Sequence, residues 1–220
     1  MDKEILEKIK QCRLMQGIDE VEKLLHCFGA KIRSFEKGEQ IVGYGDAPAI
    51  VIIVQGSAIS LSEDWFGNRN IISRVGECGV FGAAYVYAGH EVTTRLEAAE
   101  ACRAVFLSGQ KIQSPCQNNC LEHTQFLCNA ISLVSRSCVR FLEKVEHLSR
   151  RTMRDRVLSY LTEQGVKNGK NIFIIPFSRQ ELADYLAVDR SALSAELSRM
   201  KRDGLIDFKR SHFVLLKKNQ

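Results

Sequence analysis

Between residues 127 and 148 the apolar side chains recur with gaps of 4, 3, 4, 3, 4 and 3, and this spacing limits how the chain can fold. The spacing places them on one face of a single long α-helix. The stripe is narrower than the apolar face of most helices that pack on their own core. We therefore expect two copies to pair in parallel as a homodimer, with an ordinary core-facing helix as the alternative. The interface residues would be Leu127, Ile131, Val134, Cys138, Phe141, Val145 and Leu148.

The segment before this helix has the sequence pattern of a β-sheet protein. From residue 31 to residue 108, short β-branched runs such as "AIVIIVQGSAISLS" alternate with glycine turns. Strands of about 5–8 residues with frequent turn signals are typical of a small sandwich or barrel. Residues 1–28 show helical spacing instead, for example at Ile5 and Ile9. Together with the long helix, this predicts an α+β fold.

Two helices and a tight bend are expected in "SRQELADYLAVDRSALSAELSRMKRDGLI", residues 178–206. Ser178 with Glu181 forms a capping box that starts the first helix. The bend falls at "AVD", where Asp189 can cap a second helix that ends at Gly204. The apolar residues of the second helix follow i, i+4, i+7 spacing and would face the core; they are Leu193, Leu197 and Met200.

A β-hairpin follows, because "LIDFKRSHFVLL" alternates around a polar centre that holds Lys209 and Arg210. A helix, a tight turn, a second helix and a basic hairpin make a winged helix-turn-helix. A new helix should also start near Thr152, whose capping partner is Asp155. We therefore divide the chain into a β-rich domain with short N-terminal helices (1–115), a dimerisation helix (116–148) and a winged helix-turn-helix domain (149–220).

The charge is concentrated at the C-terminal end. Residues 1–148 hold 16 Lys/Arg and 18 Asp/Glu, a net charge of −2, whereas residues 149–220 hold 15 and 8, a net charge of +7. A basic C-terminal third suggests a polyanionic partner, with a plain solvated basic surface as the alternative. The second helix could enter the major groove of double-stranded DNA with Arg190 reaching guanine, while Ser178, Arg179 and the hairpin meet phosphates. The predicted DNA-binding residues are Ser178, Arg179, Asp189, Arg190, Ser191, Ser194, Ala195, Ser198, Arg199, Lys209 and Arg210.

Nearly every segment of the chain resembles the Crp/Fnr family of bacterial transcription regulators. The resemblance rests on "KGEQI", "IVQGSAIS", "GECGVFGAA", the long helix and, most specifically, residues 178–206. It implies an N-terminal β-roll (a double-stranded β-helix or jelly-roll) for an effector, a dimerisation helix and a C-terminal winged helix-turn-helix. It also implies a non-enzymatic homodimer that binds inverted-repeat DNA and contacts RNA polymerase.

The chain departs from the members that bind cyclic AMP. Those members carry Gly-Glu-Leu, and further along an arginine followed by serine or threonine. Here the first motif reads Gly82-Ala83-Ala84, and Thr93 or Val92 stands at the arginine position, with Thr94 next. Burying a phosphate without its cation is costly. We therefore expect no cyclic AMP, and a pocket at Gly82, Ala83, Ala84, Thr93, Thr94 and Phe141 that either takes another, less charged ligand or is filled by the protein's own side chains.

The second helix of residues 178–206 also departs from the family pattern. Family members often carry a base-reading arginine where this chain has Ala195, and a glutamate where it has Ser191. Alanine can touch a thymine methyl group but cannot hydrogen-bond guanine. The operator should therefore differ from the best-known sites of the family.

The eight cysteines are expected to be free thiols in a reducing compartment, and their spacing forms no metal site. The fifteen-residue gap between Cys12 and Cys27 does not match the iron–sulfur members of the family. A thiol switch at Cys116 and Cys120, or haem or metal ligation by His26, His90 or His123, is a weaker alternative. So we expect no metal or cofactor.

The charged N-terminus and the short apolar runs predict a soluble, cytoplasmic protein without membrane contact. Two other functions compete with the regulator. A cupin-type enzyme would need clustered histidines in the β-rich segment, which holds only His90. A module that binds ligands or proteins through the β-roll, without DNA, is the better competitor.

Overall fold

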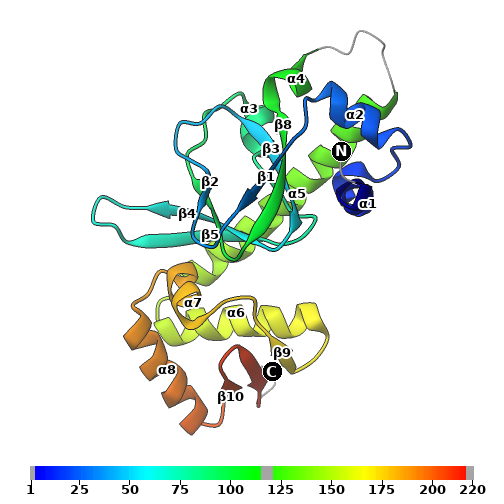
Figure 1. The fold of residues 1–220 in the computed structure, drawn as a ribbon. Coiled ribbons are helices and arrows are strands. Elements are labelled where there is room, and N and C mark those ends of the chain that lie inside the picture. Colours follow the sequence, from blue (N-terminus) through cyan, green and yellow to red (C-terminus); the bar gives the residue numbers. More distant parts are fainter. Residues whose placement is uncertain (1–2, 115–120, 217–220) are drawn as a thin grey trace. The chain divides into compact units, whose positions relative to one another are not determined.

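A computed structural model describes residues 3–114 and 121–216 of the 220-residue chain. The fold is α+β, as predicted, and divides into two compact units (Figure 1). Unit 1 comprises the residues up to Ser62 together with Ile72–Cys138. Unit 2 comprises Glu63–Ile71 and the chain from Val139 onward. The Cys116 and Cys120 pair lies outside the described residues.

Unit 1 begins with three short helical segments. They are α1 (Lys3–Gln11), the 3-10 helix η1 (Arg13–Met15) and α2 (Val21–Cys27). Ile5 and Ile9 are 2% and 0% exposed, because their spacing of four puts both on one face of α1. This face packs into an apolar cluster that also contains Phe126 and Ala130.

The β-rich segment forms two antiparallel four-stranded sheets. The first has the order β1-β8-β3-β6 and the second the order β2-β7-β4-β5. The strands of the first sheet are β1 (Lys31–Phe35), β8 (Cys102–Ser108), β3 (Ala49–Gln55) and β6 (Val80–Phe81). Those of the second are β2 (Gln40–Val42), β7 (Arg95–Ala98), β4 (Ala58–Glu63) and β5 (Arg69–Val75). Two short helices complete this part: α3 (Ala83–Ala88) and α4 (Gly109–Gln113).

Strand β3 explains the uninterrupted apolar run "IVIIV". Its alternate residues Ile50 and Ile52 join the cluster formed with α1 and α2, whereas Val51 and Ile53 join the cluster of the β-roll interior. Successive side chains of a strand point to opposite faces. A strand covered on both faces therefore needs apolar residues at every position.

The long helix α5 (Leu121–Ser149) confirms the prediction from the 4, 3 spacing. Its buried positions are not the predicted stripe but the neighbouring one, which includes Phe126 and Ala130 in unit 1 and Lys144 and His147 in unit 2. The predicted stripe is thereby left largely on the surface.

Unit 2 contains the predicted helices, turn and wing. Helix α6 (Met153–Asn168) starts at Thr152, whose hydroxyl accepts from the Asp155 amide. Helices α7 (Arg179–Leu186) and α8 (Arg190–Arg202) follow. The strands β9 (Ile172–Ile174), β10 (Ile206–Lys209) and β11 (His212–Leu215) form a sheet of order β10-β11-β9.

The expectation that all cysteines are free thiols is wrong for one pair. Cys12 and Cys78 form a disulfide in unit 1. They are 66 residues apart in sequence, so no local spacing could reveal them, and the fold brings their Cα atoms to 4.8 Å. Cys27, Cys102, Cys128 and Cys138 are free. Within the described ranges, no helix is long and apolar enough to cross a membrane.

Candidate nucleic-acid interface

The two helices of the predicted motif are fixed at their ends by short-range hydrogen bonds. The Ser178 hydroxyl accepts from the Glu181 amide at 3.3 Å, and the Glu181 carboxylate accepts from the Ser178 amide at 2.6 Å. Helix α7 ends at Ala187 in the left-handed region, with φ of 52°. Asp189 then caps α8 by accepting from the Ala192 amide at 2.8 Å. The turn between α7 and α8 is therefore set by sequence-local contacts.

Helix α8 buries one face and exposes the other. Leu193, Leu197 and Met200 are 0% exposed. The exposed face holds six predicted DNA-binding residues, which are Arg190, Ser191, Ser194, Ala195, Ser198 and Arg199. The structure thus brings these residues together on one solvent-facing surface, which we call the α8 face.

The α8 face carries one extended cation at its start and hydroxyl groups along its length. The Arg190 guanidinium donates to no acceptor within the described residues. The Ser191 hydroxyl donates to Asp189 Oδ1 at 2.5 Å, and this bond, followed by the Ala192 amide, lowers the pKa of the Asp189 carboxyl. The Ser194 and Ser198 hydroxyls donate to the carbonyls four residues earlier, at 3.0 and 2.9 Å. Each serine oxygen can still accept a hydrogen bond from a base or from water.

Two ion pairs join α6 to α8 and its C-terminal end, and a third lies within α8. Arg154 of α6 pairs with Glu196 at 2.6 Å and with Asp203 at 2.8 Å. The hydrogen bonds that Arg154 donates to these two carboxylates raise the pKa of its guanidinium. Arg199 also reaches Glu196, at 3.3 Å. The sequence analysis missed Arg154 and Glu196, because the partners lie 42 residues apart and no local pattern links them.

Arg179 takes a different position from the other predicted contacts. Its guanidinium lies 5.0 Å from the ring centre of Phe208 and 5.7 Å from that of Phe213, both in the wing. It also donates to the Arg210 carbonyl at 3.4 Å, and burial lowers its pKa. Arg179 therefore connects α7 to the wing through cation–π contacts and a hydrogen bond. A phosphate contact by this residue stays a prediction.

The wing presents the two basic residues that the sequence predicted for its tip. The β10–β11 register pairs Lys209 with His212, so Arg210 and Ser211 form the turn. Lys209 and Arg210 are both exposed, and Arg210 has a φ of 56°. Ser211 donates to the Phe177 carbonyl at 3.1 Å, which ties the turn to the segment before α7.

In unit 1, the predicted effector pocket contains a tyrosine that the sequence analysis did not consider. Tyr85 of α3 places its hydroxyl 3.2 Å from Thr93 Oγ1 and 3.1 Å from Thr94 Oγ1. Gly82 starts α3 with a φ of 89°, and a Cβ there would collide with the Ala49 carbonyl. Ala83 is buried and Ala84 is exposed.

No cation was expected beside these threonines. Arg95, the residue after Thr94, pairs its guanidinium with Glu97 at 2.7 Å. Phe141, the last predicted pocket residue, belongs to unit 2 and is 46% exposed.

The predicted dimer stripe is exposed in the single chain. Leu127 is 42%, Ile131 55% and Val145 62% exposed. Cys138 is exposed too, whereas Val134 and Leu148 are half-buried. Val139 and Leu142, which the 4, 3 spacing excludes, are also exposed and widen this apolar surface.

The histidines considered as ligands are scattered. His26 and His90 are exposed, and the ring of His123 packs edge-on against Phe28 at 4.9 Å. In residues 3–114 and 121–216, no three His, Cys, Asp or Glu side chains come together as a metal site.

Two family models match the chain. The cyclic nucleotide-binding domain covers residues 32–119, and the Crp-like helix-turn-helix domain covers residues 155–220. The transcriptional activator protein FnrL of Cereibacter sphaeroides is 32% identical over 78 residues. That alignment spans 31% of this chain and 32% of FnrL, so the chain matches about a third of the relative's length.

Solved structures share the fold across most of the chain. FixK2 from Bradyrhizobium japonicum superposes with a TM-score of 0.67 at 20% identity, over 86% of this chain and 93% of its own. The c-di-GMP-responsive regulator CLP from Xanthomonas campestris superposes with a TM-score of 0.72 at 17% identity, over 91% of this chain and 100% of its own. With both domain models matched in order, the chain belongs to the Crp/Fnr family of DNA-binding transcription regulators, which are not enzymes.

Proposed function

We propose that the protein is a homodimer that binds an inverted-repeat operator in double-stranded DNA and regulates transcription from it. The observation that carries the proposal is the α8 face. Its side chains are polar or small, its first residue is an arginine available to a ligand, and its opposite face is fully buried.

The chemistry of the α8 face suggests how a half-site is read. Arg190 at the start of the helix can donate two hydrogen bonds to O6 and N7 of guanine. Ala195, one turn further, can contact a thymine methyl group. Ser178, Lys209 and Arg210 flank the helix and suit phosphate contacts, which position the protein without reading sequence.

The exposed stripe of α5 supports the homodimer. Apolar side chains as exposed as Ile131 and Val145 are normally covered by a partner when they form a continuous patch. A parallel pair of α5 helices would relate the two α8 faces by a two-fold axis. Such dimers read half-sites centred one helical turn apart, ~34 Å.

We further propose that control comes from an effector other than cyclic AMP or from redox state. This proposal is supported by the neutral Tyr85 hydroxyl, which lies beside Thr93 and Thr94, where a bound phosphate would call for a cation. Contact with RNA polymerase follows from the family resemblance alone.

Selection of random duplex DNA on the full-length protein at about 150 mM salt tests the proposal, because non-specific backbone binding is weak there. An enriched inverted repeat with one-turn spacing is the expected result. If neither the protein alone nor the protein with cell extract enriches any sequence, the DNA-binding function is refuted. The alternative, a β-roll that binds ligands or proteins without DNA, would then stand.

A further inference from the structure

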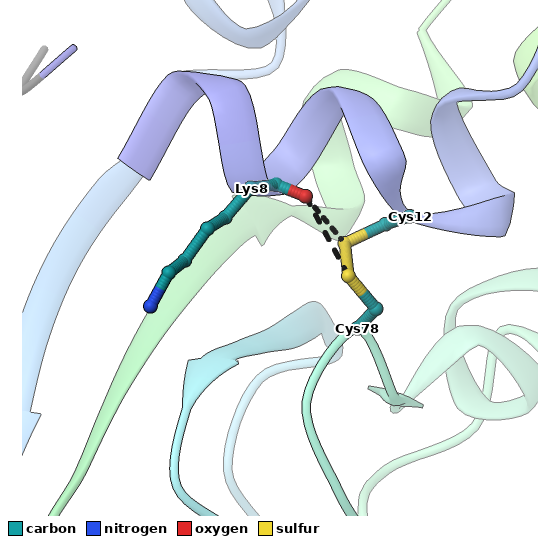
Figure 2. The surroundings of a disulfide bond; sticks show 3 residues. All are labelled: Lys8, Cys12 and Cys78. Atoms are coloured by element: carbon teal, nitrogen blue, oxygen red, sulfur yellow. Dashed lines mark hydrogen bonds between the residues drawn. A yellow bond between two sulfur atoms is a disulfide. The ribbon is translucent and has the colours of Figure 1, made fainter. Parts of the chain in front are cut away.

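The disulfide joins the N-terminal helical segment to a turn of the β-roll. Cys12 directly follows α1, and Cys78 lies in the "GECG" turn between β5 and β6 (Figure 2). Their Cα atoms are 4.8 Å apart, inside the range over which disulfides form. Both cysteines belong to unit 1.

The same site suits two free thiols. The Cys12 and Cys78 sulfur atoms lie 3.3 and 3.5 Å from the Lys8 carbonyl oxygen, as Figure 2 shows. Lys8 lies in the last turn of α1, where carbonyls lack their regular amide partner, and the Cys12 amide donates to Ile9 instead. In the dithiol form both S–H groups can therefore donate to the Lys8 carbonyl oxygen. Reduction then leaves neither thiol without a hydrogen-bond acceptor.

Cys78 is held in place by backbone contacts as well as by the disulfide. Its amide donates to the Ile53 carbonyl at 2.8 Å, and the Ile53 amide donates to the Gly79 carbonyl at 3.0 Å. These bonds fix the turn to β3 and hold Cys78 at a φ of 58°. The turn should therefore keep its shape when the disulfide is reduced, and the mobile partner is the Cys12 segment.

The Cys12 segment in turn holds the dimerisation helix. The Asn129 side-chain amide on α5 donates to the Leu14 carbonyl at 3.0 Å and to the Gln16 carbonyl at 2.8 Å. Phe126 and Ala130, on either side, are buried in the same cluster as Cys12. A covalent and hydrogen-bonded path thus runs from the β5–β6 turn through Cys12 to the first half of α5.

We propose that Cys12 and Cys78 form a reversible redox site whose dithiol and disulfide states set how firmly α1 and η1 hold the first half of α5. Its substrates are dithiol reductants and the corresponding disulfides. The redox site itself is independent of the proposed function, whereas its effect on DNA binding rests on that function.

Thiol–disulfide exchange balances the reaction without another reactant. A thiolate of the reductant attacks Cys78, which is half-exposed, while Cys12 is 1% exposed. A mixed disulfide forms, and the Cys12 sulfur leaves as a thiolate and takes up a proton. The second thiol of the reductant then displaces Cys78. Two protein thiols and one reductant disulfide result, a two-electron exchange that runs backwards when the disulfide is in excess.

The redox site is tested by equilibrating the full-length protein with mixtures of reduced and oxidised dithiothreitol. Alkylation of thiols followed by peptide mass spectrometry then reports each cysteine. Cys12 and Cys78 should lose alkylation together along one two-electron curve, while the exposed Cys27 and Cys128 stay alkylated throughout. Independent curves for Cys12 and Cys78, or a pair that is fully alkylated under oxidising conditions, would overturn the proposal.

Hydrogen exchange tests the coupling without DNA. Reduction should speed amide exchange in α1, η1 and the first half of α5, whereas the β5–β6 turn should change little. The Cys78→Ser variant should match the reduced protein under both conditions, and Cys27→Ser should behave like the original protein. Cys12→Ser provides a second route to the reduced state if one variant fails to fold. Exchange rates that do not differ between the two states would refute the coupling.

DNA affinity, measured on an operator from the selection, tests regulation. Allosteric coupling typically changes affinity by about 5–150-fold, so we expect about a tenfold difference between oxidised and reduced protein. Cys78→Ser should abolish the difference. Equal affinities in the two states would refute regulation through this pair. Absence of binding in both states would contradict the proposed function instead, and the exchange experiment would still decide the redox coupling.

Discussion

The hydroxyl of Tyr85 lies 3.1 Å from the Oγ1 of Thr94. Tyr85 comes from α3, three residues after Gly82, which matches the glycine that starts the nucleotide-binding motif in related proteins. Thr94 comes from the segment that would supply the arginine of that motif. A neutral phenol thus meets neutral hydroxyls where a phosphate would need positive charge. We therefore expect Tyr85 to fill the part of the predicted effector pocket where a nucleotide phosphate would lie.

Cyclic AMP should therefore not bind. A ligand present at a hundred times its Kd stabilises the folded state by about 2.7 kcal/mol, which a thermal unfolding scan detects easily. We expect about 1 mM cyclic AMP to leave Tm unchanged, since even a micromolar site would be saturated at that concentration. Tyr85→Phe should lose about 1 kcal/mol of stability through the missing hydrogen bonds and also fail to bind. A saturable rise in Tm would contradict the self-filled pocket.

Arg190→Ala should weaken operator binding by about 1–3 kcal/mol and relax the preference at one base pair in each half-site. The reason is the loss of a two-donor contact with guanine rather than the loss of charge alone. Arg202→Ala, at the other end of α8, is the matched control and should keep the sequence preference. Competition binding with each single-base operator variant measures both effects. An unchanged preference profile for Arg190→Ala would show that this residue does not read a base.

Ile131→Asp should convert the dimer into monomers, because it places a charge in the centre of the exposed α5 stripe. Ser132→Asp introduces the same charge one residue further, on another face of the helix, and should leave the dimer intact. Sedimentation or light scattering of the purified proteins gives the mass directly. If both variants remain dimeric, the partner surface lies elsewhere.

The helices and turns that could be predicted from the sequence are those fixed by residues close together in the chain. Ser178 and Glu181 are three residues apart, as are Thr152 and Asp155, so their caps could be read from spacing alone. The buried face of α8 and the turn at the wing tip follow from periodicity in the same way. These features explain why the fold class and the buried and exposed sides of α8 could be predicted.

Contacts between distant residues could not be predicted. Arg154 meets Glu196 only after α6 and α8 pack, and Cys12 meets Cys78 only after the β-roll closes. Arg179 matched the pattern of a phosphate ligand, but the wing supplies two aromatic rings that attract its guanidinium. Each of these depends on tertiary structure, which periodicity and capping rules do not contain.

Reduction of the disulfide should lower the free energy of unfolding. Cys12 and Cys78 close a loop with a sequence separation of 66 residues, for which chain entropy gives about 4 kcal/mol. Urea unfolding with and without dithiothreitol, followed by circular dichroism, measures the difference. Cys27→Ser should show the same loss on reduction, whereas Cys78→Ser should show none. Equal stability of oxidised and reduced protein would mean that the denatured chain is not restrained by this link.

Because of Lys144, the free energy of unfolding should increase with pH in the alkaline range. The residue is 7% exposed, and its ammonium group donates to the Ile71 carbonyl and lies 4.6 Å from the centre of the Tyr185 ring. Burial lowers the pKa of Lys144 to about 8, from an ordinary value of 10.5. Between these two values the unfolded chain holds a proton that the folded protein has released, so the free energy of unfolding increases with pH. The full difference corresponds to about 3 kcal/mol.

Comparison with Lys144→Met isolates this contribution, because methionine does not titrate. The stability of the original protein relative to the variant should rise by about 2–3 kcal/mol between about pH 7.5 and pH 10.5. Tyr185 is not expected to interfere, since burial raises the pKa of its hydroxyl to about 12. Tyr185→Phe is the control and should keep the pH dependence, because it preserves the ring beside the ammonium. Parallel stability curves for the original protein and Lys144→Met would show that Lys144 keeps its charge in the folded state throughout this range.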